Sequence, residues 1–172
     1  GTKVVTFSSA GVAINASRVS YVNTAGNTWT ASYTAVGSDT DGAVTYSIVV
    51  GDLAGNPGVA VTTGTGSVTF DDTDPARTSV TVASNNSLVT HAKSGNAVTV
   101  ELTTDVAVSQ PVVVFKSGGA ALNNASGRVI TYTNTNSPNK TEWSAAYTVD
   151  AADTDGLVSF DIDFSDLAGN AA

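Results

Sequence analysis

The chain has 172 residues, enough for one domain or two small ones. Valine and threonine each occur 25 times, against 6 leucines and 4 isoleucines, which favours β-strands and speaks against a helical bundle or an α/β enzyme. Cysteine is absent, histidine occurs once and the net charge is −8, so the sequence predicts no disulfide, no thiolate chemistry, no nucleic-acid partner and no membrane insertion.

Runs of alternating apolar and polar residues, bounded by Gly, Asn, Asp or Pro, predict strands along the whole chain. In the first part of the chain they fall at Val4–Phe7, Trp29–Ala35, Val44–Val50 and Ser67–Phe70. In the second part they fall at Ser79–Ala83, Ala97–Leu102, Val112–Phe115, Trp143–Val149 and Val158–Phe164. No segment of useful length shows helical spacing, so the expected class is all-β.

The chain also repeats itself. The segment Asp52-Leu-Ala-Gly-Asn56 recurs 114 positions later, as do Asp39-Thr-Asp-Gly42 and the pair Trp29 and Tyr33. Upstream of these anchors the offset falls to 108, where Val5 and Phe7 match their later copies. Several anchors in order, with gaps confined to polar segments, indicate a repeat of about 110 residues.

The chain holds only about one and a half such repeats. The first repeat lacks a counterpart of Thr78–Val108, and the second lacks a counterpart of Val59–Phe70. We therefore expect domains at 1–75 and 76–172, cut from a longer tandem array. The first would lack two strands and the second one, which leaves sheet edges unpaired. The chain alone is then expected to be unstable or to associate, with neighbouring copies of the repeat supplying the missing strands.

These residues carry a resemblance. Asp-Thr-Asp-Gly, a strand ending in Asp-Leu-Ala-Gly-Asn, and then Val68-Thr-Phe-Asp-Asp-Thr-Asp-Pro75 resemble bacterial immunoglobulin-like (Big-type) tandem repeats. Such repeats form stalks of secreted surface adhesins and related cell-envelope proteins. The resemblance implies tandem immunoglobulin-like β-sandwiches, an extracellular location and a structural role as a spacer in an adhesin, S-layer or filament.

The carboxylates are the main candidate site. The chain has 13 Asp and only 2 Glu, and several Asp cluster around the segment that joins the two repeats. Such a cluster suits a hard cation with oxygen ligands, and Ca²⁺ fits; the alternative is that these residues are solvated turn formers. The candidate ligands are Asp39, Asp41, Asp71, Asp72, Asp74, Asp105, Asp166 and Asn170. Calcium bound there would stiffen the junction between the repeats.

Other candidates have plainer explanations. Asp52 and its copy Asp166 are expected to close tight turns, and Trp29 and Tyr33, which could stack on a sugar, are expected in the core. The lone His91 is expected to be a solvated loop residue. Four Asn-X-Ser/Thr sequons occur, at Asn15, Asn85, Asn124 and Asn139.

No nucleophile–base pair or phosphate loop is visible, so the sequence predicts no enzyme. The second function class is a module that binds a glycan or a protein. The third is an accessory domain of a secreted hydrolase.

Overall fold

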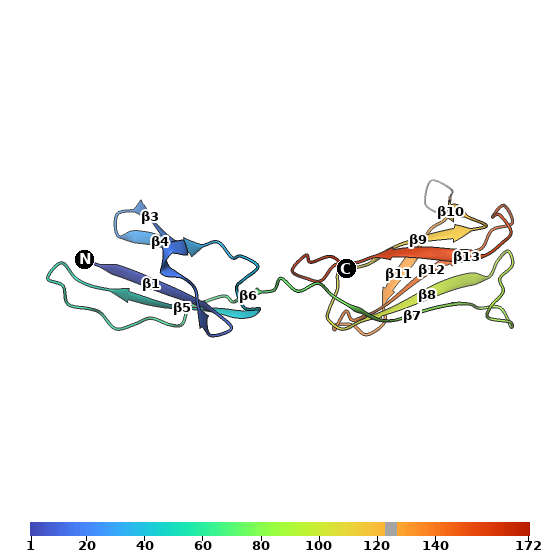
Figure 1. The fold of residues 1–172 in the computed structure, drawn as a ribbon. Helices are drawn as coiled ribbons and strands as arrows, with labels where there is room; N and C mark the ends of the chain where they lie inside the picture. Colours follow the sequence, from blue (N-terminus) through green and yellow to red (C-terminus); the bar gives the residue numbers. More distant parts are fainter. Residues whose placement is uncertain (123–126) are drawn as a thin grey trace. The chain divides into compact units, whose positions relative to one another are not determined.

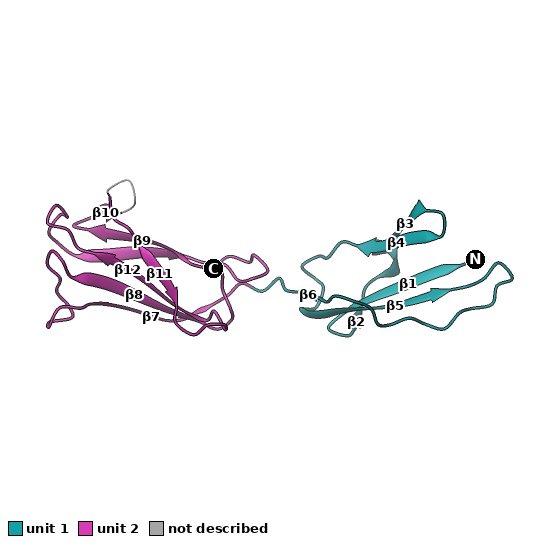
Figure 2. Cartoon of the chain, turned by 180° about the vertical axis from the view of Figure 1, so that it is seen from behind, with its two compact units in different colours: residues 1–73 teal, residues 74–172 magenta. Residues whose placement is uncertain are grey.

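A computed structural model describes residues 1–122 and 127–172 of the chain. It is an all-β structure that divides into two compact units, residues 1–73 and 74–172, and each unit is described by itself (Figures 1 and 2). The sequence had placed this boundary two residues later. The described residues contain one helical turn, the 3₁₀ segment Ala16–Arg18, and no helix with the length and hydropathy of a membrane span.

Unit 1 consists of an antiparallel four-stranded sheet and a separate two-stranded hairpin. The sheet has the order β2-β1-β5-β6, and the hairpin pairs β3 with β4. The strands are β1 (Lys3–Ser9), β2 (Val12–Ala13), β3 (Val19–Ala25), β4 (Thr28–Tyr33), β5 (Gly42–Val50) and β6 (Val68–Phe70). The hairpin lies over the sheet as a second layer (Figure 1).

Unit 2 has two sheets of three and four strands. One has the order β10-β9-β13 and the other β11-β12-β8-β7. The strands are β7 (Arg77–Ser84), β8 (Ala97–Thr104), β9 (Val112–Ser117), β10 (Ala120–Leu122), β11 (Thr131–Asn134), β12 (Glu142–Thr148) and β13 (Val158–Asp163). Both sheets contribute to one core, an arrangement consistent with a β-sandwich.

The two units share their strand pairing and several contacts. The pair β1–β5 corresponds to β9–β13, and β3–β4 corresponds to β11–β12. The Val5 amide donates to the Tyr21 hydroxyl at 2.9 Å, and the Val113 amide donates to the Tyr132 hydroxyl at 3.0 Å. The sequence repeat is therefore also a repeat of backbone pairing and of side-chain contacts.

The units differ in how far they bury their apolar residues. The core cluster lies wholly in unit 2 and consists of Val98, Val100, Val113, Phe115, Leu122, Ala145 and Tyr147. Phe115 and Tyr147 are 0% and 2% exposed, and their rings lie 4.8 Å apart. The matching rings of Phe7 and Tyr33 lie at 4.9 Å but are only half-buried. The same aromatic pair thus sits in a closed core in one unit and in an open one in the other.

Each predicted strand is present, with ends that differ by up to two residues. None of the nine predicted ranges covers β2, β3, β10 or β11. Strand β3 was missed because nearly all its residues are exposed, so it has no buried face and shows no clear alternation.

Candidate functional site

Asp39 is held by an arginine that the sequence analysis did not consider. The Arg18 guanidinium donates to both Asp39 carboxylate oxygens, at 2.6 and 2.5 Å, and the Val36 amide adds a bond at 3.0 Å. The Arg18 hydrogen bonds lower the pKa of Asp39 to about 2. Arg18 and Asp39 come from segments on either side of the β3–β4 hairpin, so the ion pair fixes the ends of that hairpin.

Unit 2 contains the same ion pair. Arg128 Nε donates to Asp153 at 2.8 Å, and the Asp150 amide donates to the other Asp153 oxygen at 2.9 Å. The Asp153 side chain is only 4% exposed. The repeated Asp-Thr-Asp-Gly motif therefore begins with an aspartate whose neighbour is a guanidinium. Asp39 and Arg18 match Asp153 and Arg128 in the aligned repeats, which was a signal available in the sequence.

Asp41 ties the end of β6 to the loop before β5. One Asp41 oxygen accepts from the Asp72 amide at 3.1 Å, and the other accepts from the Thr73 hydroxyl at 2.5 Å. The Thr73 amide also donates to Asp71 at 3.3 Å. These contacts hold the loop before β5 against the segment that follows β6. A Cβ at Gly37 would lie 2.6 Å from a carboxylate oxygen of Asp72, so a larger residue there would displace that side chain.

The acidic candidates of unit 2 also contact the backbone. Asp105 accepts from the Ala76 amide at 2.8 Å, while the Asp105 amide donates to the Ala76 carbonyl at 3.0 Å. Asp74 is exposed at the start of the unit. Asp105 therefore stabilises the beginning of β7 against the end of β8.

Asp166 is the most buried of the candidate ligands, at 3% exposed. It accepts from the Gly169 amide at 2.7 Å, from the Asn170 amide at 2.9 Å and from the Asn170 side-chain amide at 2.8 Å. Burial alone would raise the pKa of Asp166, but these hydrogen bonds outweigh it and lower the pKa. Asp52 makes the same bonds with Asn56, at 2.9 Å each, and they lower its pKa as well. Both segments are tight turns, as expected.

The eight candidate ligands thus divide between the units: Asp39, Asp41, Asp71 and Asp72 belong to unit 1, and Asp74, Asp105, Asp166 and Asn170 to unit 2. Within the described residues, no three histidine, aspartate or glutamate side chains form a group that could hold a metal ion. Calcium binding stays a prediction. Within the two units, one carboxylate oxygen each of Asp39, Asp41, Asp71, Asp105 and Asp166 accepts a hydrogen bond from a backbone amide.

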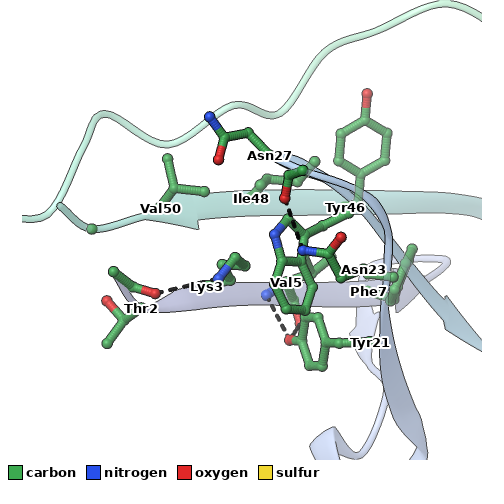
Figure 3. A pocket seen from close by; sticks show the side chains of 15 residues that line it. Thr2, Lys3, Val5, Phe7, Tyr21, Asn23, Asn27, Tyr46, Ile48 and Val50 are labelled. Atoms are coloured by element: carbon green, nitrogen blue, oxygen red, sulfur yellow. Dashed lines mark hydrogen bonds between the residues drawn. The ribbon is translucent and has the colours of Figure 1, made fainter. Parts of the chain in front are cut away.

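Unit 1 contains a site that the sequence analysis did not name, an apolar hollow of about 790 Å³ between its sheet and its hairpin. Figure 3 shows Val5 and Phe7 from β1, Tyr46 and Ile48 from β5, and Tyr21 from β3 around this hollow. Trp29 of β4 also lines it and is 43% exposed, with the Lys3 ammonium 3.9 Å from the centre of its ring. The expectation that Trp29 lies in the core therefore holds only in part.

The hollow exists because β4 is paired on one edge only. In unit 2 the corresponding strand β12 has β11 on one edge and β8 on the other, and β8 closes the core. The described part of unit 1 has no strand in the place of β8. The signal was the missing counterpart of Thr78–Val108, which leaves one sheet of the first repeat uncovered.

Two further sets of polar residues are an ion pair on β13 and the Asn-X-Ser/Thr sequons. Asp161, on β13, forms an exposed ion pair with Lys116 at 2.5 Å. Among the sequons, Asn15 accepts a hydrogen bond from the Ser17 amide, Asn85 accepts one from the Ala97 amide at the start of β8, and Asn124 lies outside the described residues.

Comparisons with known proteins found no match: no family model, no curated protein and no solved structure matches the chain.

Proposed function

We propose that the chain is a structural spacer, made of tandem immunoglobulin-like repeats in an extracellular surface protein such as an adhesin, an S-layer protein or a filament. One observation carries the proposal: the strand pairing, the tyrosine bridge between layers and the Arg–Asp ion pair recur in two consecutive units. A repeated unit suits a role in which length and stiffness matter. The resemblance to bacterial immunoglobulin-like repeats supports the extracellular location.

The spacer role can be tested by determining the sequence of the gene on either side of the region that encodes this chain. Sequencing the open reading frame that flanks residues 1–172 is expected to show further copies of the roughly 110-residue repeat. A reading frame in which no further copy occurs would contradict the spacer role. A catalytic domain next to a single pair of repeats would favour the accessory role instead.

The proposal includes calcium at the segment that joins the units. Asp71, Asp72 and Asp74 lie in that segment, and all three are exposed. Asp41 accepts hydrogen bonds from Asp72 and Thr73, and Asp105 accepts one from Ala76. Extracellular modules bind Ca²⁺ with Kd of roughly 10⁻⁴–10⁻³ M, which matches millimolar calcium outside cells. At calcium about 100-fold above Kd, binding would add about 2.7 kcal/mol to the bound arrangement.

Calorimetry and small-angle scattering test the calcium proposal. Titration of the 172-residue protein with calcium is expected to give binding heat and a changed maximum dimension, both reversed by EDTA. The D72N/D74N variant should lose both responses, whereas the matched D161N/D163N variant, altered on a strand of unit 2, should keep them. Absence of heat and of any dimensional change would contradict calcium binding.

A glycan-binding module is the second candidate, and the exposed Trp29 ring in the hollow of unit 1 favours it. Aromatic rings at the mouth of a hollow can stack on sugar rings. Binding of an oligosaccharide on a glycan array, lost in the W29A variant, would support this function over the spacer.

A further inference from the structure

The free edge of β4 and the apolar hollow beside it belong to one surface. This surface, here called the open face, consists of the inward side chains of β4 together with those of β1 and β5 that line the hollow. Trp29, Ala31 and Tyr33 alternate along β4 with outward Thr30 and Ser32. Backbone groups along the second edge of β4 have no strand partner in the described part of unit 1. An unpaired strand next to an apolar surface is a template for an added strand.

Unit 2 shows what covers the corresponding surface. There β8 pairs antiparallel with β12, and β7 pairs with β8. Opposite residues are Trp143 and Leu102, Ala145 and Val100, and Tyr147 and Val98. Val98, Val100 and Leu102 are each at most 3% exposed. The sequence of β8 therefore fits a surface made of Trp, Ala and Tyr in this spacing.

We propose that the open face of unit 1 binds a β-hairpin of the β7–β8 type, supplied by a further copy of the repeat that lies outside residues 1–172. The inner strand of the donor adds antiparallel to the free edge of β4, and its alternate aliphatic side chains enter the hollow. The 114-residue offset fixes the register: Val98, Val100 and Leu102 of the donor lie opposite Tyr33, Ala31 and Trp29. This inference rests on the free edge and on the pairing in unit 2, and it does not require the spacer role.

The proposed register is defined to a single residue, because successive side chains of a strand point to opposite faces of the sheet. A slip of one residue would turn Thr99 and Glu101 into the hollow and the valines out to water. The chain contains no cysteine, so a pair of introduced thiols reports the register without background. Opposite residues on paired strands have Cβ atoms about 4.5–5.5 Å apart, close enough for a disulfide after small adjustments.

The experiment adds a synthetic peptide of residues 77–104 to the intact 172-residue protein. The A31C protein is mixed with the V100C peptide under mild oxidation, and cross-linked product is measured by mass spectrometry. We expect a yield several-fold above that of the T99C peptide, whose thiol would face away. Equal yields from the two peptides would overturn the proposed register, and no yield from either would overturn the proposal.

Hydrogen exchange on the protein without introduced cysteines gives a second, independent measurement. The peptide is expected to slow exchange of the amides of β4 by about tenfold or more, as pairing does for a previously free edge. A peptide with V98K and V100K should have no effect, while the matched T81K/T99K peptide, with the same added charge on the outer face, should keep it. No slowing by the unsubstituted peptide would overturn the proposal.

The same hydrogen-exchange measurements would reveal two other occupants of the open face. Protection of β4 that rises with protein concentration and needs no peptide would assign the open face to self-association of this chain. Protection by an oligosaccharide, with none by the peptide, would assign it to glycan binding. Either result would contradict hairpin donation.

Discussion

Arg18 and Asp39 show how a single ion pair can make one unit sensitive to acid. The folded-state pKa of Asp39 is about 2, against an ordinary value of 3.8. A carboxyl whose pKa is lowered by folding contributes stability above its unfolded pKa and loses that contribution as the pH falls. The unit 1 contribution is therefore complete above about pH 4 and disappears as the pH approaches 2.

The first prediction follows from the lowered pKa of Asp39. In the W143F protein, where Trp29 of unit 1 is the one remaining tryptophan, the urea midpoint followed by fluorescence should fall between about pH 4 and pH 2. The D39N variant should have a lower midpoint at neutral pH and a weaker acid dependence. The D161N variant, altered at an exposed carboxylate of unit 2, serves as the control. An acid dependence that D39N leaves unchanged would contradict the assignment to Asp39.

The second prediction concerns Tyr147, whose buried hydroxyl has no hydrogen-bond partner among the described residues. Burial also raises the pKa of this phenol. An unsatisfied buried polar group costs roughly 1–3 kcal/mol, so Y147F should leave the free energy of unfolding of unit 2 unchanged or raise it by about 1 kcal/mol. Urea unfolding of a W29F background, read from Trp143, measures it. A loss of more than about 1 kcal/mol would show that the hydroxyl has a stabilising partner.

At the level of the elements, two tyrosines link strands that do not pair with one another. Tyr132 of β11 accepts from the Val113 amide of β9, so its hydroxyl joins the two sheets of unit 2. Tyr21 of β3 makes the same link to Val5 of β1, but in the more open unit 1. The contribution of each hydrogen bond to stability depends on whether water can take the place of the tyrosine hydroxyl.

The third prediction compares these two links. Y132F should lower the stability of unit 2 by about 1–3 kcal/mol, because the Val113 amide belongs to a residue that is 3% exposed and would lose its partner. Y21F should cost less, because that hydrogen bond is exposed and water can take its place. Chemical unfolding of the two variants provides the comparison, and equal losses would contradict it.

The elements also show what the sequence could and could not predict. Strands with one buried face, such as β8 and β12, were predicted because their alternation reflects burial. Strand β3 was missed because its exposed residues leave no alternation to read. The loop of Asp41 contacts the segment after β6, which the sequence pattern had indicated. The partner of Asp39 was missed because Arg18 lies 21 residues away and leaves no local pattern, and only the recurrence of the pair as Arg128 and Asp153 could have shown it.

For the whole molecule, the two units differ in the amount of apolar surface that they bury. The core cluster lies in unit 2, and the only apolar side chain classed as buried among the described residues of unit 1 is Ile14. Hydrophobic burial is the main favourable contribution to folding, at roughly 25 cal/mol per Å². Unit 1 should therefore have a smaller free energy of unfolding than unit 2.

The fourth prediction is that unit 1 unfolds before unit 2. Hydrogen exchange at increasing urea should show the amides of β1, β3, β4 and β5 opening at lower denaturant than those of β8, β9 and β12. A single cooperative transition of a monodisperse monomer would contradict this order and the repeat boundaries drawn from the sequence. The peptide of residues 77–104 should narrow the gap if it completes unit 1.

The topology of the unit 1 sheet has a consequence for how that unit responds to a pulling force. Strands β1 and β6 each run antiparallel to β5, so they run parallel to one another and are loaded in shear when tension acts from Lys3 to Phe70. Seven residue pairs join β1 to β5, but β6 is joined by three, Gly42–Phe70 to Val44–Val68. Under tension β6 should separate first and release residues 62–67, about 20 Å of chain at full extension, because Val61 is hydrogen-bonded separately to Ile48 of β5. Unit 1 would then lengthen in a small, early step while its larger sheet pairing stayed intact.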